Sequence, residues 1–140
     1  MRQKAVKKFV LVLPSKPKEI GRVDYFLQKV NRTACLNDDQ YNKLLVATTE
    51  AVNNSIIHGN GRDSRKNVTI TCIIEDSMLT VRIHDEGHGF DATTLPDPLA
   101  EENLLREHGR GVFLMRSLME SVEFEKKKKG SDVVMTIIIE

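Results

Sequence analysis

Cysteine is scarce in this sequence, and long apolar runs are missing from it. Cys35 and Cys72 are its two cysteines, far apart and outside any CxxC spacing. This argues against a disulfide framework or a zinc site and predicts two buried thiols. Phe9 to Leu13 gives only five apolar residues before Pro14, too few for a signal-peptide core, and no run approaches the roughly 20 residues of a membrane span. We therefore expect a reduced, cytoplasmic chain with no membrane partner.

An excess of charge of one sign is also absent. Lys and Arg total 21 against 20 Asp and Glu, so the formal net charge is +1. This balance gives no electrostatic reason to expect direct binding to nucleic acid or to a membrane. At 140 residues, the chain suits one compact domain over residues 1–140 and is too short for two catalytic modules. Function must therefore be argued from local sites.

Apolar periodicity predicts the secondary structure in the order strand, two helices, hairpin, loop, helix, hairpin. Strands are expected within 5–13, 68–83 and 122–139, with the last two regions forming hairpins. Helices are expected over 16–32, with Ser15 as the cap, and over 37–58 and 111–119. Hairpin-linked strands beside clustered helices indicate an α+β layer pair and not a doubly wound parallel sheet.

The helix predicted over 37–58 is apolar on almost every side, so we expect it to be buried all round. Glu50, Asn54 and His58 recur every four residues along it and form one polar ridge. A buried carboxylate or amide without a partner is costly, so the ridge predicts either protein partners or a ligand with its ion. An exposed edge with an ordinary i,i+4 pair is the alternative.

Two glycine motifs follow this helix. Asp85-Glu86-Gly87-His88-Gly89 begins where a strand ends, which places a carboxylate beside backbone that a ligand can approach; an ordinary Asp-Gly turn is the alternative. Gly109-Arg110-Gly111 precedes the last helix, where backbone N–H groups suit a phosphate; a hinge with a surface Arg is the alternative. Residues 86–110 lack sustained periodicity and predict a long functional loop. The sequence has no GxxxxGK[ST] and no GxGxxG in a βαβ unit, which excludes both common nucleotide-binding layouts.

Taken together, three segments resemble the N box and the two glycine boxes of GHKL ATPases: Glu50-Ala51-Val52-Asn53-Asn54 through His58-Gly59, Asp85-x-Gly87-x-Gly89, and Gly109-x-Gly111. Within that superfamily the chain is most similar to anti-sigma-factor serine/threonine kinases of the RsbW and SpoIIAB type. The segments EAVNNSIIHG and GRGVFLMRSLME carry this similarity. The resemblance covers most of the chain. It implies a Bergerat-type two-layer α/β sandwich, with a mostly antiparallel mixed sheet, helices on one face and an ATP lid at about 86–110.

The resemblance also implies roles for single residues. Asn54 would coordinate the Mg²⁺ that bridges the phosphates of ATP, and Asp85 would accept a hydrogen bond from the adenine amino group. Glu50, one turn before Asn54, is placed to accept a proton from an attacking hydroxyl. Histidine kinases typically carry Asn at that position, so Glu50 argues for a hydroxyl or water nucleophile. The other nucleotide-binding positions would be Gly87, Gly89, Gly109, Arg110 and Gly111.

By resemblance, the chain would use ATP to phosphorylate a serine or threonine of a STAS-domain anti-sigma-factor antagonist, or would hold a sigma factor inactive, as a homodimer. A nucleotide-switched binding module without phosphoryl transfer is the alternative. A clamp like gyrase or MutL proteins needs a transducer domain that 140 residues cannot hold, and Glu50 disfavours a histidine-kinase catalytic domain. Arg110 could contact the γ-phosphate or a partner, with a solvated lid residue as the equal alternative; Arg106 has the same two interpretations, and His58 is expected to pack near the helix end and not to catalyse. Lys126 to Lys129 are expected to form a solvated hairpin tip.

Overall fold

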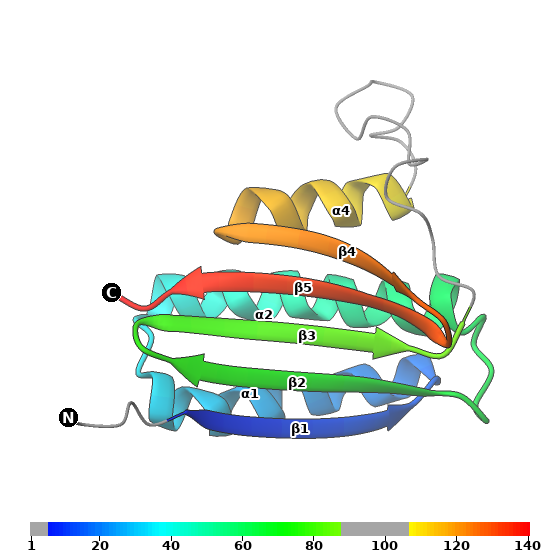
Figure 1. Cartoon of the computed structure of the whole chain (residues 1–140), viewed down its shortest axis with the longest axis horizontal. Helices are drawn as coiled ribbons and strands as arrows, with labels where there is room; N and C mark the ends of the chain where they lie inside the picture. Colours follow the sequence, from blue (N-terminus) through cyan, green and yellow to red (C-terminus); the bar gives the residue numbers. More distant parts are fainter. Residues whose placement is uncertain (1–5, 88–106) are drawn as a thin grey trace.

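The computed structural model describes residues 6–87 and 107–140, and places helices on one face of a sheet (Figure 1). Its elements follow the predicted order. They are β1 (Lys7–Pro14), η1 (Pro17–Ile20), α1 (Gly21–Ala34), α2 (Asp38–Asn54), η2 (Ser55–Gly59), β2 (Asn67–Glu75), β3 (Met78–Asp85), α4 (Glu107–Leu118), β4 (Ser121–Lys127) and β5 (Gly130–Ile138). The predicted two-layer α+β fold is confirmed.

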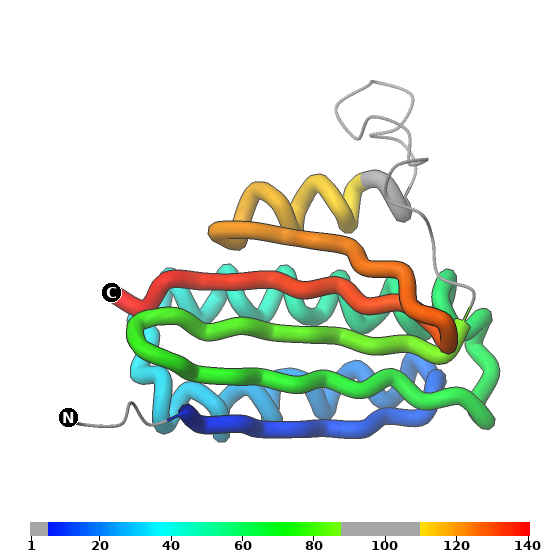
Figure 2. Tube along the Cα trace, in the orientation of Figure 1, coloured from blue at the N-terminus to red at the C-terminus, as the bar shows by residue number. Residues whose placement is uncertain are grey.

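The described strands form one five-stranded sheet in the order β1-β2-β3-β5-β4, and each of its four neighbouring pairs is antiparallel. The β2–β3 and β4–β5 pairs are the two predicted hairpins. β3 pairs with β5, which places Asp85 opposite Ser131 at the end of both strands. The chain trace in Figure 2 shows this end of the sheet, where β3 stops beside the turn between β4 and β5. The pairing of the two hairpins thus brings Asp85 and Ser131 together at one end of the strands.

Alternation along the strands buries one face of the sheet against α1 and α2. Val81 on the central strand lies opposite Cys72 on one side and Met135 on the other, and all three are fully buried. Each such side chain contributes roughly 1.5–3 kcal/mol through the apolar area removed from water. Burial raises the pKa of the Cys72 thiol to about 12, so this cysteine is an inert core residue. Among the described helices, none is long and apolar enough to cross a bilayer.

Several local predictions are wrong. Ser15 does not cap a helix: its hydroxyl donates to the carbonyl of Lys66 at 2.7 Å and accepts from the Asn60 amide at 2.7 Å, which ties β1 to the segment before β2. The first helical turn begins at Pro17 instead, since proline's fixed φ suits that position. Cys35 is exposed and not buried; it adopts a left-handed φ of 55° at the C-terminal end of α1.

Candidate functional site

The polar ridge predicted on α2 exists, but its three members differ in environment. Glu50 is half-buried, Asn54 is 6% exposed and His58 is exposed. The amide nitrogen Nδ2 of Asn54 is buried and has no hydrogen-bond partner among the described residues. The α-helix ends at Asn54 and continues as the π-helical turn η2, an irregularity that often marks functional sites. Asn54 is therefore the member of the ridge that most needs a partner from outside the described protein groups.

The expectation that α2 is buried all round is wrong. Val46 on this helix is 42% exposed, whereas Ala47 and Ala51 are buried. The helix lies on one face of a single sheet, so only part of its surface is covered. Gly111 of α4 lies against Glu50 and Asn54 on this helix, and Asn54 also faces the sheet across a small cavity.

Helix α4 packs Gly111 against Glu50 and Asn54 of α2. A methyl group at Gly111 would lie 3.1 Å from Oε2 of Glu50 and 3.1 Å from Nδ2 of Asn54. Three of the predicted site residues are thus brought together. The predicted helix start is wrong, because α4 begins at Glu107 and already contains Gly109, Arg110 and Gly111. Gly111 is a close-packing position inside this helix and does not mark its N-terminus.

Asp85 is the buried carboxylate at the end of β3, with 4% of its surface exposed. Its Oδ1 accepts the backbone N–H of Gly87 at 3.1 Å, and its Oδ2 accepts the hydroxyl of Ser131 at 3.1 Å. Burial raises the pKa of Asp85 above its ordinary value, because the loss of hydration outweighs these two hydrogen bonds. The two hydrogen bonds fix the orientation of this buried carboxylate as an acceptor.

Sequence reasoning did not name Ser131. A signal for it exists, since Ser131 is a polar residue on the face of β5 that carries Val133, Met135 and Ile137 into the core. Only the β3–β5 register shows that its partner is Asp85.

Glycines allow the end of η2 and the end of β3 to meet at Asp85. A methyl group at Gly59 would lie 2.3 Å from Oδ2 of Asp85, and one at Gly87 would lie 1.5 Å from the carbonyl oxygen of Gly59. Side chains at these two positions would displace the end of η2 from the end of β3. Gly89 and Arg106 lie outside the described residues, as does most of the predicted lid.

Gly87→Ala is expected to lower the free energy of unfolding by about 2–4 kcal/mol, since its methyl group would overlap backbone that has no room to move. Gly21→Ala is the matched control, because no atom lies within 4 Å of the added methyl group. Urea unfolding of both variants measures the difference. Equal stabilities for the two variants would contradict the close approach of Gly87 to Gly59.

A small cavity lies between the two halves of the site. Asn54, Asp85 and Ser131 line it with polar atoms, and Ala51, Met115 and Val133 contribute apolar surface. Its volume of about 10 Å³ suits roughly one water molecule. Apolar walls with a few convergent polar groups are typical of small-molecule sites. The structure therefore places Asn54 and Asp85, which are distant in sequence, on one cavity between α2, α4 and the sheet.

A family model described as the histidine kinase-like ATPase domain matches residues 13–137. The chain belongs to this family. Its relatives include the anti-sigma F factor of Oceanobacillus iheyensis, which is 34% identical over 70% of this chain and 69% of its own length. The serine-protein kinase RsbW of Listeria monocytogenes is 28% identical over 92% of this chain and 85% of its own length. The predicted GHKL resemblance is confirmed.

Solved structures share the fold of this histidine kinase-like ATPase domain. The RsbU and RsbW domains of a Mycobacterium tuberculosis protein match with a TM-score of 0.68 at 12% identity, over 95% of this chain. The chain spans 32% of that solved chain. The histidine kinase domain of a blue-light activated kinase from Erythrobacter litoralis matches with a TM-score of 0.54 at 14% identity, over 90% of this chain and 61% of its own. At these identities the likeness concerns the fold alone.

Proposed function

We propose that this chain is a serine/threonine protein kinase that transfers phosphate from Mg-ATP to a STAS-domain anti-sigma-factor antagonist. In this proposal it also holds a sigma factor inactive and, by the family resemblance, acts as a homodimer. The observation that carries the catalytic part is the placement of Glu50 beside Asn54. Both side chains lie against Gly111 of α4, where an added methyl group would meet them at 3.1 Å, and the buried Nδ2 of Asn54 lacks a partner among the described groups. The anti-sigma F factor and the RsbW serine kinase among its relatives support the biological role.

The adenine end of the proposed nucleotide site is Asp85. Its carboxylate is fixed by Gly87 and Ser131, so that a lone pair remains available to accept the adenine amino group. Glycine at position 59 keeps a side chain away from this carboxylate, and glycine at position 87 allows the backbone of Gly59 to approach it. In the proposed function, Gly89, Gly109 and Arg110 also contact the nucleotide.

The residues at the phosphate end of the proposed nucleotide site suit Mg²⁺. Asn54 offers an amide and Glu50 a carboxylate, which are the hard oxygen donors that this ion prefers. The described residues hold no cluster of three or more His, Cys, Asp or Glu that could bind a metal alone. A site of this kind suits an ion that takes most of its ligands from phosphates and water. When bound, Mg²⁺ would neutralise charge on the transferring phosphoryl group. Asn54 is the protein group proposed to hold it.

Glu50 is proposed to act on the acceptor hydroxyl. Its carboxylate lies one helical turn from Asn54, within reach of a group that approaches the phosphate end of the site. The hydroxyl oxygen forms a bond to the γ-phosphorus, the bond from that phosphorus to the bridging oxygen of ADP breaks, and the hydroxyl proton passes to Glu50. Most of the remaining rate enhancement would come from positioning and charge neutralisation.

Nucleotide entry requires a rearrangement in this proposal. The cavity between Asn54 and Asp85 has a volume of about 10 Å³, far less than a purine base needs, and Met115 of α4 forms part of its wall. Because α4 also covers Glu50 and Asn54 through Gly111, its outward movement would open both ends of the site together.

Transfer of labelled γ-phosphate from ATP to a purified STAS-domain protein tests the proposed function. The expected product is a phosphoserine or phosphothreonine on that protein, formed only when ATP and Mg²⁺ are both present. If ATP binds and no STAS-domain protein is labelled, the kinase proposal fails. A partner affinity that still differed between ATP and ADP would then establish a nucleotide-switched binding module in its place.

A further inference from the structure

The turn between β4 and β5 concentrates positive charge at one end of the sheet. Lys126, Lys127, Lys128 and Lys129 are consecutive and all are exposed, and the last two form the two-residue connection between the strands. The whole chain carries a net charge of only +1, so this accumulation is local. We call Lys126–Lys129 the lysine turn.

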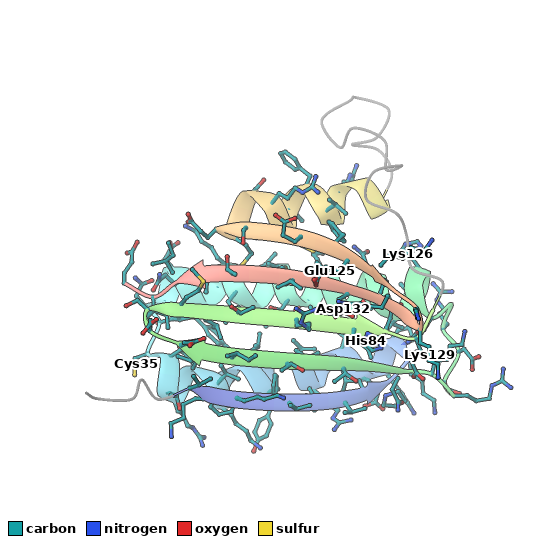
Figure 3. The ribbon with its side chains drawn as sticks, in the orientation of Figure 1. Cys35, His84, Glu125, Lys126, Lys129 and Asp132 are labelled. Carbon is teal, nitrogen blue, oxygen red and sulfur yellow. The ribbon has the colours of Figure 1, made fainter. Side chains whose placement is uncertain are left out.

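The carboxylates beside the lysine turn already have cationic partners. Nη1 of Arg82 lies 2.5 Å from Oδ2 of Asp132 and 2.9 Å from Oε2 of Glu125. Nδ1 of His84 lies 2.6 Å from the other oxygen of Asp132. Figure 3 shows His84, Glu125 and Asp132 close together on neighbouring strands, next to the labelled lysines. The Arg82 guanidinium thus serves both carboxylates, and of the four lysines only Lys127 pairs with either of them.

Within residues 6–87 and 107–140, most of the lysine turn has no counter-charge. Lys127 lies 3.7 Å from Glu125, a carboxylate that Arg82 already shares. Lys126, Lys128 and Lys129 form no ion pair within the described part of the chain. The nearby Glu86 points its carboxylate at the backbone N–H of Asn67. Three ammonium groups remain for an external anion.

The lysine turn also encloses a hollow, and its backbone is held in place. The four lysines line an open depression of about 680 Å³ together with His84, Glu86 and the backbone of Gly87. Gly130 adopts a φ of 113°, and a methyl group there would lie 1.8 Å from the carbonyl oxygen of Asp85. Since Gly130 packs directly on the end of β3, the lysine side chains extend from a fixed support. A fixed support reduces the ordering cost of binding.

We propose that the lysine turn and this depression form a docking site for an acidic segment of a protein partner. The size of the depression suits a short stretch of chain, and the three unpaired ammonium groups suit successive Asp or Glu side chains. Nucleic acid fits less well, because it requires charge along an extended surface or aromatic side chains for stacking. Of the described residues that line the depression, none is Phe, Tyr or Trp. The site goes beyond the proposed kinase function, since it uses neither Glu50 nor Asn54.

Fluorescence anisotropy with the full chain and no nucleotide tests this proposal. The probes are a fluorescein-labelled Glu-rich peptide, a Gln-rich peptide of the same length, and single-stranded DNA of the same charge as the Glu-rich peptide. The test variant combines Lys126→Gln, Lys128→Gln and Lys129→Gln. The matched control combines Lys8→Gln, Lys16→Gln and Lys18→Gln, which are exposed positions with the same total charge change.

The Glu-rich peptide is expected to bind the unmodified chain and to bind the turn variant about tenfold more weakly, with less than about a twofold change in the control. The Gln-rich peptide is expected not to bind. Failure of the Glu-rich peptide to bind would overturn the proposal, as would equal losses in both variants. Tighter binding of DNA than of the peptide, lost in the turn variant, would overturn it in favour of nucleic acid. Because nucleotide is absent, failure of ATP binding leaves this test unaffected.

Discussion

Glu50→Gln is expected to slow phosphoryl transfer to the partner hydroxyl by about 10²- to 10⁴-fold while ATP stays bound. Glutamine preserves the shape of the side chain beside Asn54 and Gly111, so packing against α4 is retained. It removes the carboxylate that would take the hydroxyl proton. Single-turnover transfer of labelled phosphate measures the chemical step, and a separate titration measures ATP affinity.

Glu75→Gln provides the control for this result. Glu75 is an exposed residue that pairs with Met78 at the far end of the β2–β3 hairpin from Asp85, so the substitution makes the same charge change without touching the site. Its transfer rate is expected to match that of the unmodified chain. An unchanged rate in Glu50→Gln would remove the base from the mechanism. Loss of ATP binding in that variant would make Glu50 a binding residue and not a base.

The neighbourhood of Glu50 could be predicted only in part from the sequence. Helix geometry fixes the spacing of Glu50 and Asn54 locally, and for that reason their position on one ridge could be derived from the sequence alone. The element that covers the ridge comes from the other half of the chain. Gly111 is predicted at a helix start because periodicity is absent before it and apolar residues fall in helical register only after it. Its actual reason is a close contact with α2, which local patterns do not encode.

The Asp85 side of the site illustrates the same limit in the sheet. The alternating residues of β3 placed Asp85 at a strand end, and the glycines after it indicated close backbone approach. The contribution of Ser131 depends on the pairing of β3 with β5, two strands from different hairpins. Period-two patterns show which side chains of a strand point to the core face of the sheet. They do not show which distant strand pairs with it. Prediction from sequence therefore reached the carboxylate and missed the hydroxyl that holds it.

Asp85→Asn is expected to weaken ATP binding by about 10- to 100-fold without lowering stability near neutral pH. The amide presents a donor where the proposed adenine amino group needs an acceptor, and an unsatisfied buried pair of this kind costs about 1–3 kcal/mol. The stability effect has a separate cause. Burial raises the pKa of Asp85 above its ordinary value of 3.8, so the folded state disfavours the charged carboxylate.

The raised pKa of Asp85 determines how its contribution to stability depends on pH. The unmodified chain loses stability as the pH rises above 3.8 and through the raised pKa, because the carboxylate ionises more readily in the unfolded chain. The asparagine variant has no such loss. We therefore compare the free energies of unfolding of the two proteins at the same pH. The value for the asparagine variant minus the value for the unmodified chain is expected to be larger at about pH 7 than at a pH below 3.8. Urea unfolding at both pH values and nucleotide titration together measure the two effects.

Asp132→Asn is the informative control, since Asp132 is a second buried carboxylate on the paired strand. It differs from Asp85 in its partners, the Arg82 guanidinium at 2.5 Å and the His84 imidazole at 2.6 Å. Removing its charge is expected to cost about 1–3 kcal/mol of stability, because Arg82 and His84 would lose the carboxylate that they share. The two substitutions thus have opposite expected signs for stability. If Asp85→Asn also lowered stability at about pH 7, the hydrogen bonds from Gly87 and Ser131 would stabilise the carboxylate by more than its burial costs.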